Sequence, residues 1–136
     1  MTRHSSRRVL VVDDHPDSAD IACTLLALYG HDARYATSGT LALELARTFD
    51  PDVAILDIGL PDISGYEVAR ELRRRAGARP LYLAAITGWG QTEDRALAYA
   101  AGFDQHVLKP ANGEKLRDIM ERAIRASSTE QPHPRA

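Results

Sequence analysis

The chain has 136 residues, enough for one domain with a hydrophobic core and too few for two ordinary domains. Apolar residues make up 44% and charged residues 26%, which excludes a disordered or fibrous chain, and the formal net charge of −2 gives no reason to expect nucleic acid as a partner. No apolar run approaches the roughly 18 residues that a membrane span needs, and no apolar signal core follows the polar N-terminus. We therefore expect a cytoplasmic protein that does not bind membranes.

The first predicted element follows a polar leader. Residues 1–7 carry no apolar pattern and are expected to be disordered, whereas residues 8–13 form an apolar strand. This strand ends in two acidic side chains, Asp13 and Asp14. Taken alone, an acidic pair here is as typical of a turn or a helix cap as of a functional site. Its interpretation therefore depends on the residues at the other strand ends.

A helix and a second strand come next. Pro16 is favoured in the first turn of a helix and Gly30 just after its end, so a helix is predicted between them. We expect its buried stripe to hold Ile21, Leu25 and Leu28. Residues 32–37 alternate enough to form a strand, less buried than the first and therefore near a sheet edge.

The middle of the chain contains the most apolar strand. Ser38 is predicted to cap the second helix, whose apolar residues recur at helical spacing: Ala42, Leu45, Ala46 and Phe49. Residues 53–57 then place four apolar residues in a row before Asp57, which is typical of a central strand buried on both faces of a parallel sheet. Burying an ionised carboxylate costs several kcal/mol unless a cation or hydrogen-bond donors meet it, so we expect Asp57 to have a partner.

A loop at 58–64 leads into a third helix at 65–76, whose last turn holds three consecutive arginines, Arg73, Arg74 and Arg75. Basic side chains are favourable at a helix C-terminus, so we interpret the triplet as solvated charge rather than as a patch for an acidic partner. Residues 81–87 form a fourth apolar strand, which ends in the hydroxyl of Thr87.

The last third of the chain predicts a helix, a strand and a helix. An Ala-rich helix spans 93–101, a fifth strand spans 104–109, and a helix at 113–126 carries apolar residues at the i, i+3, i+4 spacing: Leu116, Ile119, Met120, Ala123 and Ile124. Residues 127–136 hold two prolines without periodicity and are expected to be a tail. One domain is therefore predicted over residues 8–126.

Five alternations of strand and helix require parallel pairing with right-handed crossovers, hence a three-layer, doubly wound α/β fold with helices on both faces of the sheet. Ligands of such folds bind at the carboxyl ends of the strands. The polar residues fall there. Asp13 and Asp14 end the first strand, Asp57 the third, Thr87 the fourth and Lys109 the fifth.

Lys109 is unusual in this chain because only it and Lys115 are lysines among 17 basic residues, and the other 15 are arginines. A solvated surface cation would be expected to be Arg in such a composition. Lysine places a compact ammonium group on a flexible stem, which differs from the planar fork of arginine, so its use favours a site role.

These residues resemble the receiver domain of bacterial two-component response regulators, over residues 8–125. The matching motifs are the pair Asp13-Asp14, the loop Asp-Ile-Gly-Leu-Pro-Asp-Ile-Ser-Gly at 57–65, Ile-Thr-Gly at 86–88 and Lys109-Pro110. Each motif alone is weak, but four in the right order, each at the end of its own strand, are a strong signal. The resemblance implies a flavodoxin-like strand order of 2-1-3-4-5.

The resemblance also implies a chemistry for the acidic residues. Asp57 would take a phosphoryl group from the phosphohistidine of a histidine kinase or a histidine phosphotransfer protein and form an acyl phosphate. Mg²⁺ would be bound directly by Asp14 and Asp57, through water by Asp13, and by the main-chain carbonyl of Gly59. Such a phosphorelay switch acts on no substrate of its own, and its output would come from binding an unknown downstream protein or from passing the phosphoryl group onward.

The remaining site residues would act on the phosphoryl group. Lys109 would place its ammonium against the phosphoryl oxygens, and the Thr87 hydroxyl would hydrogen-bond the group once it had formed. Trp89 would flank it and hinder the attacking water, so we expect a changed lifetime of the phosphoryl group. His106 stands where many receivers carry Tyr or Phe as the second switch residue, and imidazole is smaller and titrates near neutral pH.

Alternatives remain open. His106 together with Gly-Phe-Asp at 102–104 is more similar to receivers attached to hybrid histidine kinases, so the chain could be a receiver cut from such a kinase. An aspartyl-phosphate phosphatase of the haloacid dehalogenase kind would need Asp-x-Asp on the first strand and a substrate cap, and neither is present. A Rossmann nucleotide site would need a Gly-rich first turn, where this chain has Asp-Asp-His-Pro-Asp.

Overall fold

The computed structural model describes residues 6–88 and 95–129, and these residues form five strands and five helices in strict alternation. The strands are β1 (Arg8–Val12), β2 (Asp32–Ala36), β3 (Val53–Asp57), β4 (Tyr82–Thr87) and β5 (Gln105–Leu108). The helices are α1 (Pro16–Leu28), α2 (Gly39–Phe49), α3 (Gly65–Ala76), α4 (Arg95–Ala101) and α5 (Gly113–Thr129).

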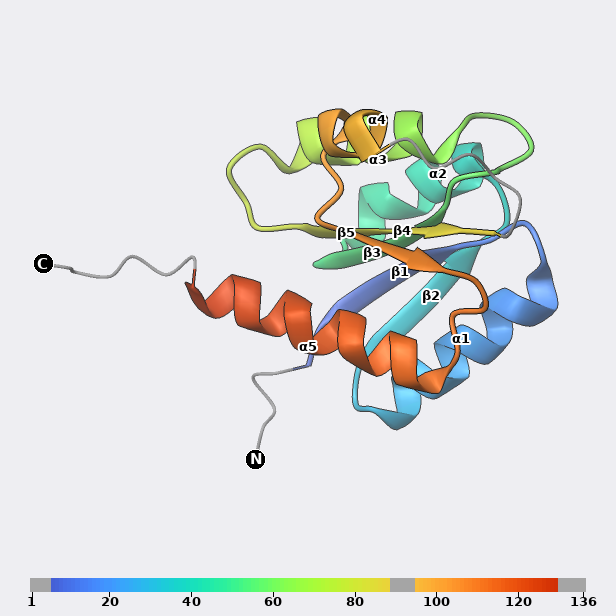
Figure 1. The fold of residues 1–136 in the computed structure, drawn as a ribbon, viewed down its shortest axis with the longest axis vertical. Helices are drawn as coiled ribbons and strands as arrows, with labels where there is room; N and C mark the ends of the chain where they lie inside the picture. Colours follow the sequence, from blue (N-terminus) through green and yellow to red (C-terminus); the bar gives the residue numbers. More distant parts are fainter. Residues whose placement is uncertain (1–5, 89–94, 130–136) are drawn as a thin grey trace, which may run out of the picture.

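The five strands form one parallel sheet in the order β2-β1-β3-β4-β5. Helices α1 and α5 cover one face, and α2, α3 and α4 cover the other (Figure 1). The predicted doubly wound α/β fold and its strand order are therefore confirmed, and β2 lies at an edge as its weak apolar pattern predicts.

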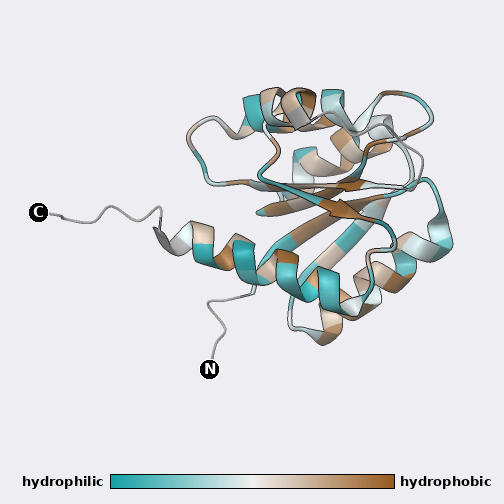
Figure 2. Ribbon diagram, in the orientation of Figure 1, coloured by the Kyte–Doolittle hydropathy of each residue, from teal (hydrophilic) through white to brown (hydrophobic). Residues whose placement is uncertain are grey.

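Two apolar cores lie on the two faces of the sheet because successive strand side chains point to opposite sides. Leu10 and Val12 of β1 pack in the cluster with α2, α3 and α4, whereas Val9 and Val11 pack in the cluster with α1 and α5. All five residues of β3 are buried, as expected of the central strand. In Figure 2 the strands are mostly hydrophobic between the two helical layers.

The predicted buried stripe of α1 is wrong at two of its three positions, whereas the third, Leu25, is partly buried and packs against the core. Ile21 and Leu28 are 61% and 75% exposed, and the buried residues of the helix are instead Ala19, Ala22 and Leu26. The small alanine side chains let the helix pack closely on the sheet. Apolar residues occur around most of the circumference of α1, so the sequence alone did not say which of them faced inward.

Several element boundaries also differ from the prediction. The last helix continues to Thr129, three residues beyond the predicted end. At the other terminus the Ser6 hydroxyl donates to the Gly30 carbonyl at 2.8 Å, and the Arg7 amide donates to His31 Nδ1 at 3.1 Å, so these two residues are bound to the turn before β2. Residues 1–5 and 130–136 lie outside the described residues, and the disordered ends stay predictions there.

Candidate functional site

Asp57 ends the central strand, and its side chain is only 3% exposed. One carboxylate oxygen, Oδ2, lies 2.8 Å from the Nζ atom of Lys109, and the other, Oδ1, accepts a hydrogen bond from the Gly59 amide at 3.0 Å. The buried carboxylate thus has both a cation and a hydrogen-bond donor, which is what its burial requires.

Lys109 reaches Asp57 from the end of β5. Its amide donates to the Thr87 carbonyl at 2.7 Å, which fixes the backbone of Lys109 beside the end of β4. Burial on its own would lower the pKa of Lys109, but the hydrogen bond to Asp57 and the negative charges of Asp57, Asp13 and Asp14 outweigh burial and raise that pKa above its usual value. The ammonium form is therefore favoured.

Asp13 lies beside the end of β3 because of the strand register, and Asp14 follows it in the chain. Val12 pairs with Leu56, so the residues that follow them, Asp13 and Asp57, leave neighbouring strands side by side. Carboxylate oxygens are the ligands that Mg²⁺ prefers. The Asp13 and Asp14 side chains are 19% and 34% exposed, so their oxygens can be reached from solvent, and this donor set fits a hard divalent cation.

His15 contacts both acidic side chains, a contact that the sequence did not predict. Its Nδ1 atom lies 3.4 Å from Asp13 Oδ1 and 3.2 Å from Asp14 Oδ1, and its amide donates to Asp13 Oδ1 at 2.9 Å. One ligand atom from each of the three residues lies within 4.8 Å of the others. The only signal in the sequence was the position of His15 directly after the acidic pair.

Thr87 is buried at the carboxyl end of β4, one residue beyond Ile86, the residue that pairs with Asp57. His106 is half-buried on β5 and pairs with Ala85. Trp89 lies outside the described residues, so its expected effect on the lifetime of the phosphoryl group stays a prediction.

Gly65, the last residue of the 57–65 motif, has a steric reason to lack a side chain. A Cβ atom there would lie 2.6 Å from the Asp57 carbonyl oxygen and 2.8 Å from Ile58 Cα. Both neighbours are backbone atoms, so a larger residue would displace the end of β3. The motif placed this glycine correctly, but the sequence alone did not give the reason.

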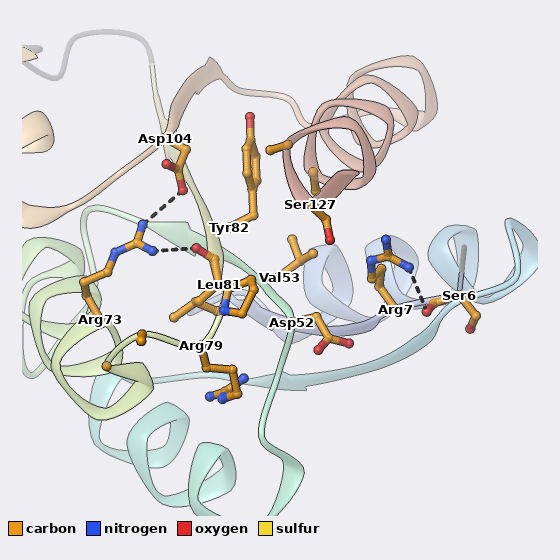
Figure 3. A pocket seen from close by; sticks show the side chains of 15 residues that line it. Ser6, Arg7, Asp52, Val53, Arg73, Arg79, Leu81, Tyr82, Asp104 and Ser127 are labelled. Carbon is orange, nitrogen blue, oxygen red and sulfur yellow. Dashed lines mark hydrogen bonds and ion pairs between the residues drawn. The ribbon is translucent and has the colours of Figure 1, made fainter. Parts of the chain in front are cut away.

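A cavity of about 970 Å³ opens at the amino ends of the strands, opposite the candidate site (Figure 3). It is lined by residues at the amino ends of the strands, among them Asp52, Leu81 and Asp104, and by none of the predicted site residues. Arg73, one of its three arginines, already donates to the Leu81 carbonyl at 2.6 Å and pairs with Asp104 at 3.0 Å. The polar cluster at the carboxyl edge therefore remains the candidate site.

The fold and the Asp57–Lys109 pair define a doubly wound α/β domain with an acidic site at the carboxyl ends of its strands. The family of response regulator receiver domains matches residues 9–121, and the chain belongs to this family. It is a receiver domain of two-component signalling. Domains of this family are typically not enzymes, use Mg²⁺ and partner with histidine kinases. Family membership favours this function over the phosphatase alternative.

The chain is also similar in sequence to several curated proteins. The chain is 38% identical to the virulence sensor protein BvgS of Bordetella pertussis over 96% of its own length and 11% of that protein, and 31% identical to the regulatory protein AtoC of Escherichia coli over 89% and 26%. The chain spans between 11% and 55% of the length of these and other curated relatives.

Solved structures agree with this assignment. The structure of a CheY-like response regulator receiver domain protein from Methanospirillum hungatei matches with a TM-score of 0.82 and 25% identity, over 92% of this chain and 98% of that one. The chemotaxis response regulator CheY4 of Vibrio cholerae matches with a TM-score of 0.78 and 25% identity, over 87% and 98%. Within the described residues, no helix is long and apolar enough to cross a membrane.

Proposed function

We propose that this receiver domain is a phospho-accepting switch in which Asp57 takes a phosphoryl group from a phosphohistidine of a histidine kinase or a histidine phosphotransfer protein. The observation that carries the proposal is the buried Asp57 carboxylate, with Lys109 Nζ 2.8 Å from one oxygen and the Gly59 amide 3.0 Å from the other. A carboxylate held in this way is a positioned nucleophile beside a cation.

In the proposed step, a carboxylate oxygen of Asp57 attacks the phosphorus atom. A P–O bond forms as the P–N bond to the donor imidazole breaks, and that imidazole, protonated on its other nitrogen, leaves as neutral histidine. The product on Asp57 is an acyl phosphate. Lys109 moves from the carboxylate to a phosphoryl oxygen, and its raised pKa keeps it cationic throughout the physiological pH range.

The acidic residues would hold the metal ion. Asp14, Asp57 and the Gly59 carbonyl would bind Mg²⁺ directly, and Asp13 would bind it through water. When bound, the ion neutralises the negative charge that would otherwise repel the incoming phosphoryl group.

Thr87 and His106 are the proposed switch residues. The Thr87 hydroxyl would move toward the phosphoryl group once it has formed and would hydrogen-bond it. The movement of Thr87 would change the surface made by β4, α4, β5 and α5. His106 takes the place that an aromatic residue has in many receivers. The output would be the binding of a downstream protein or onward transfer of the phosphoryl group.

A second candidate is that the chain acts as the receiver of a hybrid histidine kinase. The observation that favours it is the 38% identity to BvgS, a protein named as a virulence sensor, over 96% of this chain and 11% of that protein. In that case the same Asp57 site would pass its phosphoryl group onward to a histidine.

The test is phosphorylation with acetyl phosphate and Mg²⁺, followed by intact mass spectrometry. The wild-type chain is expected to gain one phosphoryl group, which hydroxylamine removes because an acyl phosphate is labile to it. The Asp57→Asn variant is expected to gain none. The Asp20→Asn variant, which changes an exposed carboxylate of α1, should be labelled like wild type. Equal labelling of the Asp57→Asn variant and wild type would contradict the proposal.

A further inference from the structure

The loop between β3 and α3, residues 58–64, is fastened to the start of α2 by the side chain of Asp62. Asp62 Oδ1 accepts the Gly39 amide at 2.9 Å, and Asp62 Oδ2 accepts the Thr40 amide at 2.9 Å and the Thr40 hydroxyl. The Thr40 hydroxyl and amide bonds, in that order, hold the pKa of the Asp62 carboxyl well below its usual range, so the carboxylate stays ionised. A carboxylate at this position also interacts favourably with the N-terminal dipole of α2.

Apolar packing brings the same loop and helix into contact. A Cβ atom at Gly39 would overlap Ile63 of the loop and lie 2.9 Å from Val68 Cγ2. The backbone of α2 therefore approaches the loop as closely as a glycine allows. This contact and the Asp62 hydrogen bonds act at the same place.

The loop is closed at its other end next to Asp57. The Ile58 amide donates to the Ile86 carbonyl at 3.1 Å, and the Gly65 amide donates to the Ile58 carbonyl at 3.1 Å. Gly59 lies between this closure and Asp62, and its amide donates to Asp57 Oδ1 at 3.0 Å. Gly59 therefore lies between two hydrogen-bonded parts of the loop.

We infer that Asp62 is a positioning residue for phosphoryl transfer: by fastening the 58–64 loop to the first turn of α2, it holds the Gly59 backbone against Asp57. The inference rests on the proposed function and adds a residue that touches neither the phosphoryl group nor the metal ion. Its action depends on a contact between residues 22 positions apart in the chain.

The structure offers a matched control at the same helix terminus. Ser38 Oγ accepts the Leu41 amide at 3.1 Å, so Ser38 and Asp62 each satisfy free amides in the first turn of α2. Ser38→Ala removes a cap from α2 without removing a hydrogen bond to the loop. Asp62→Ala removes the hydrogen bonds that join α2 to the loop.

The experiment compares wild type, Asp62→Ala and Ser38→Ala by two measurements. The first is the exchange rate of the Gly59 amide by NMR, which should rise about tenfold in Asp62→Ala and stay near the wild-type rate in Ser38→Ala, because local opening sets amide exchange. The second is the rate of labelling by acetyl phosphate at varied Mg²⁺. It should fall about tenfold in Asp62→Ala, the scale of a small misplacement of reacting groups, with more Mg²⁺ needed for half-maximal rate. Ser38→Ala should label within about twofold of wild type, although both variants melt at lower temperature than wild type.

The outcomes separate this inference from the proposed function. If the wild-type chain is labelled and the Asp62→Ala and Ser38→Ala variants are labelled at equal rates, the role of Asp62 is overturned and the proposed function stands. Unchanged Gly59 exchange in Asp62→Ala would do the same. A wild-type chain that takes no phosphoryl group at Asp57 would overturn both.

Discussion

The ammonium of Lys109 lies 2.8 Å from Asp57 Oδ2, although the strands that carry the two residues are not neighbours. Strand β4 runs between β3 and β5, so the lysine side chain passes over the end of β4, where Thr87 lies. The pair therefore closes the site across three strands. The Asp57 side chain is 3% exposed and that of Lys109 is 33% exposed. Water can therefore stabilise the charge of the lysine but hardly that of the carboxylate, which relies on Lys109 for this.

Replacing Lys109 by methionine should destabilise the fold because it leaves the Asp57 carboxylate buried without a cation. We expect the free energy of unfolding to fall by about 1–3 kcal/mol, less than for a fully buried pair since Lys109 is partly solvated. Urea unfolding measures this change. Lys115→Met, which alters the other lysine of the chain and removes its exposed hydrogen bond to the Leu108 carbonyl, should cost no more than about 1 kcal/mol. Adding Asp57→Asn to Lys109→Met should recover most of the loss, and a double variant that is no more stable than Lys109→Met would contradict this explanation.

The sequence predicted the fold and the place of the candidate site residues at the strand ends because both depend on local patterns. Buried central strands are apolar runs, and a parallel sheet brings its strand ends to one edge, so Asp13, Asp57 and Lys109 could be placed together without coordinates. The prediction of which residues of α1 are buried was wrong for Ile21 and Leu28, because the helix carries apolar residues on several sides. Only packing on the sheet selects Ala19 and Leu26 over the others.

The remaining features could not be predicted because they depend on contacts between distant segments. Arg73 has the same local pattern as Arg74, yet Arg73 alone of the two reaches Leu81 and Asp104. The bond between Asp62 and Thr40 likewise requires the loop and α2 to be brought together by the fold. Local sequence does not encode such distances.

Mg²⁺ should stabilise the folded chain. Three carboxylates at one edge of the sheet repel one another, and an ion that binds only the folded state raises its stability by about 2.7 kcal/mol at a concentration 100 times the Kd. The melting temperature should therefore rise with added MgCl₂ and not with NaCl at equal ionic strength. The combined variant Asp13→Asn and Asp14→Asn should lose this response, whereas Asp32→Asn, at an exposed position on β2, should keep it. A response that survived the combined variant would place the ion elsewhere.

Arg73 should contribute to stability in a way that Arg74 does not. Its guanidinium donates to the carbonyls of Leu81 and Gly102 and pairs with Asp104, and so ties α3 to the starts of β4 and β5. Arg73→Ala leaves these acceptors without their donor and should lower the free energy of unfolding by about 1–3 kcal/mol. Arg74 is mostly exposed and, among the residues that the structure describes, pairs with Glu71 alone. Arg75 also contacts Glu71, so Arg74→Ala should cost less than about 0.5 kcal/mol in the same urea titration. Equal losses would show that Arg73, too, acts as solvated charge.

His31 should make stability depend on pH. Its Nδ1 atom accepts the Arg7 amide at 3.1 Å, and burial together with the charge of Arg7 lowers the pKa of His31 below its usual 6.5. The folded state thus favours neutral imidazole, so this contribution is complete above the unfolded pKa and is lost as pH falls through the folded one. Protonation removes the acceptor and should cost no more than about 1 kcal/mol, since the side chain is half-buried. His31→Asn offers a side-chain oxygen that does not titrate, so the stability difference between wild type and this variant, measured by urea unfolding from about pH 7.5 to 5, should shift against wild type on acidification. A difference that stays constant over this range would rule out His31 as the titrating group.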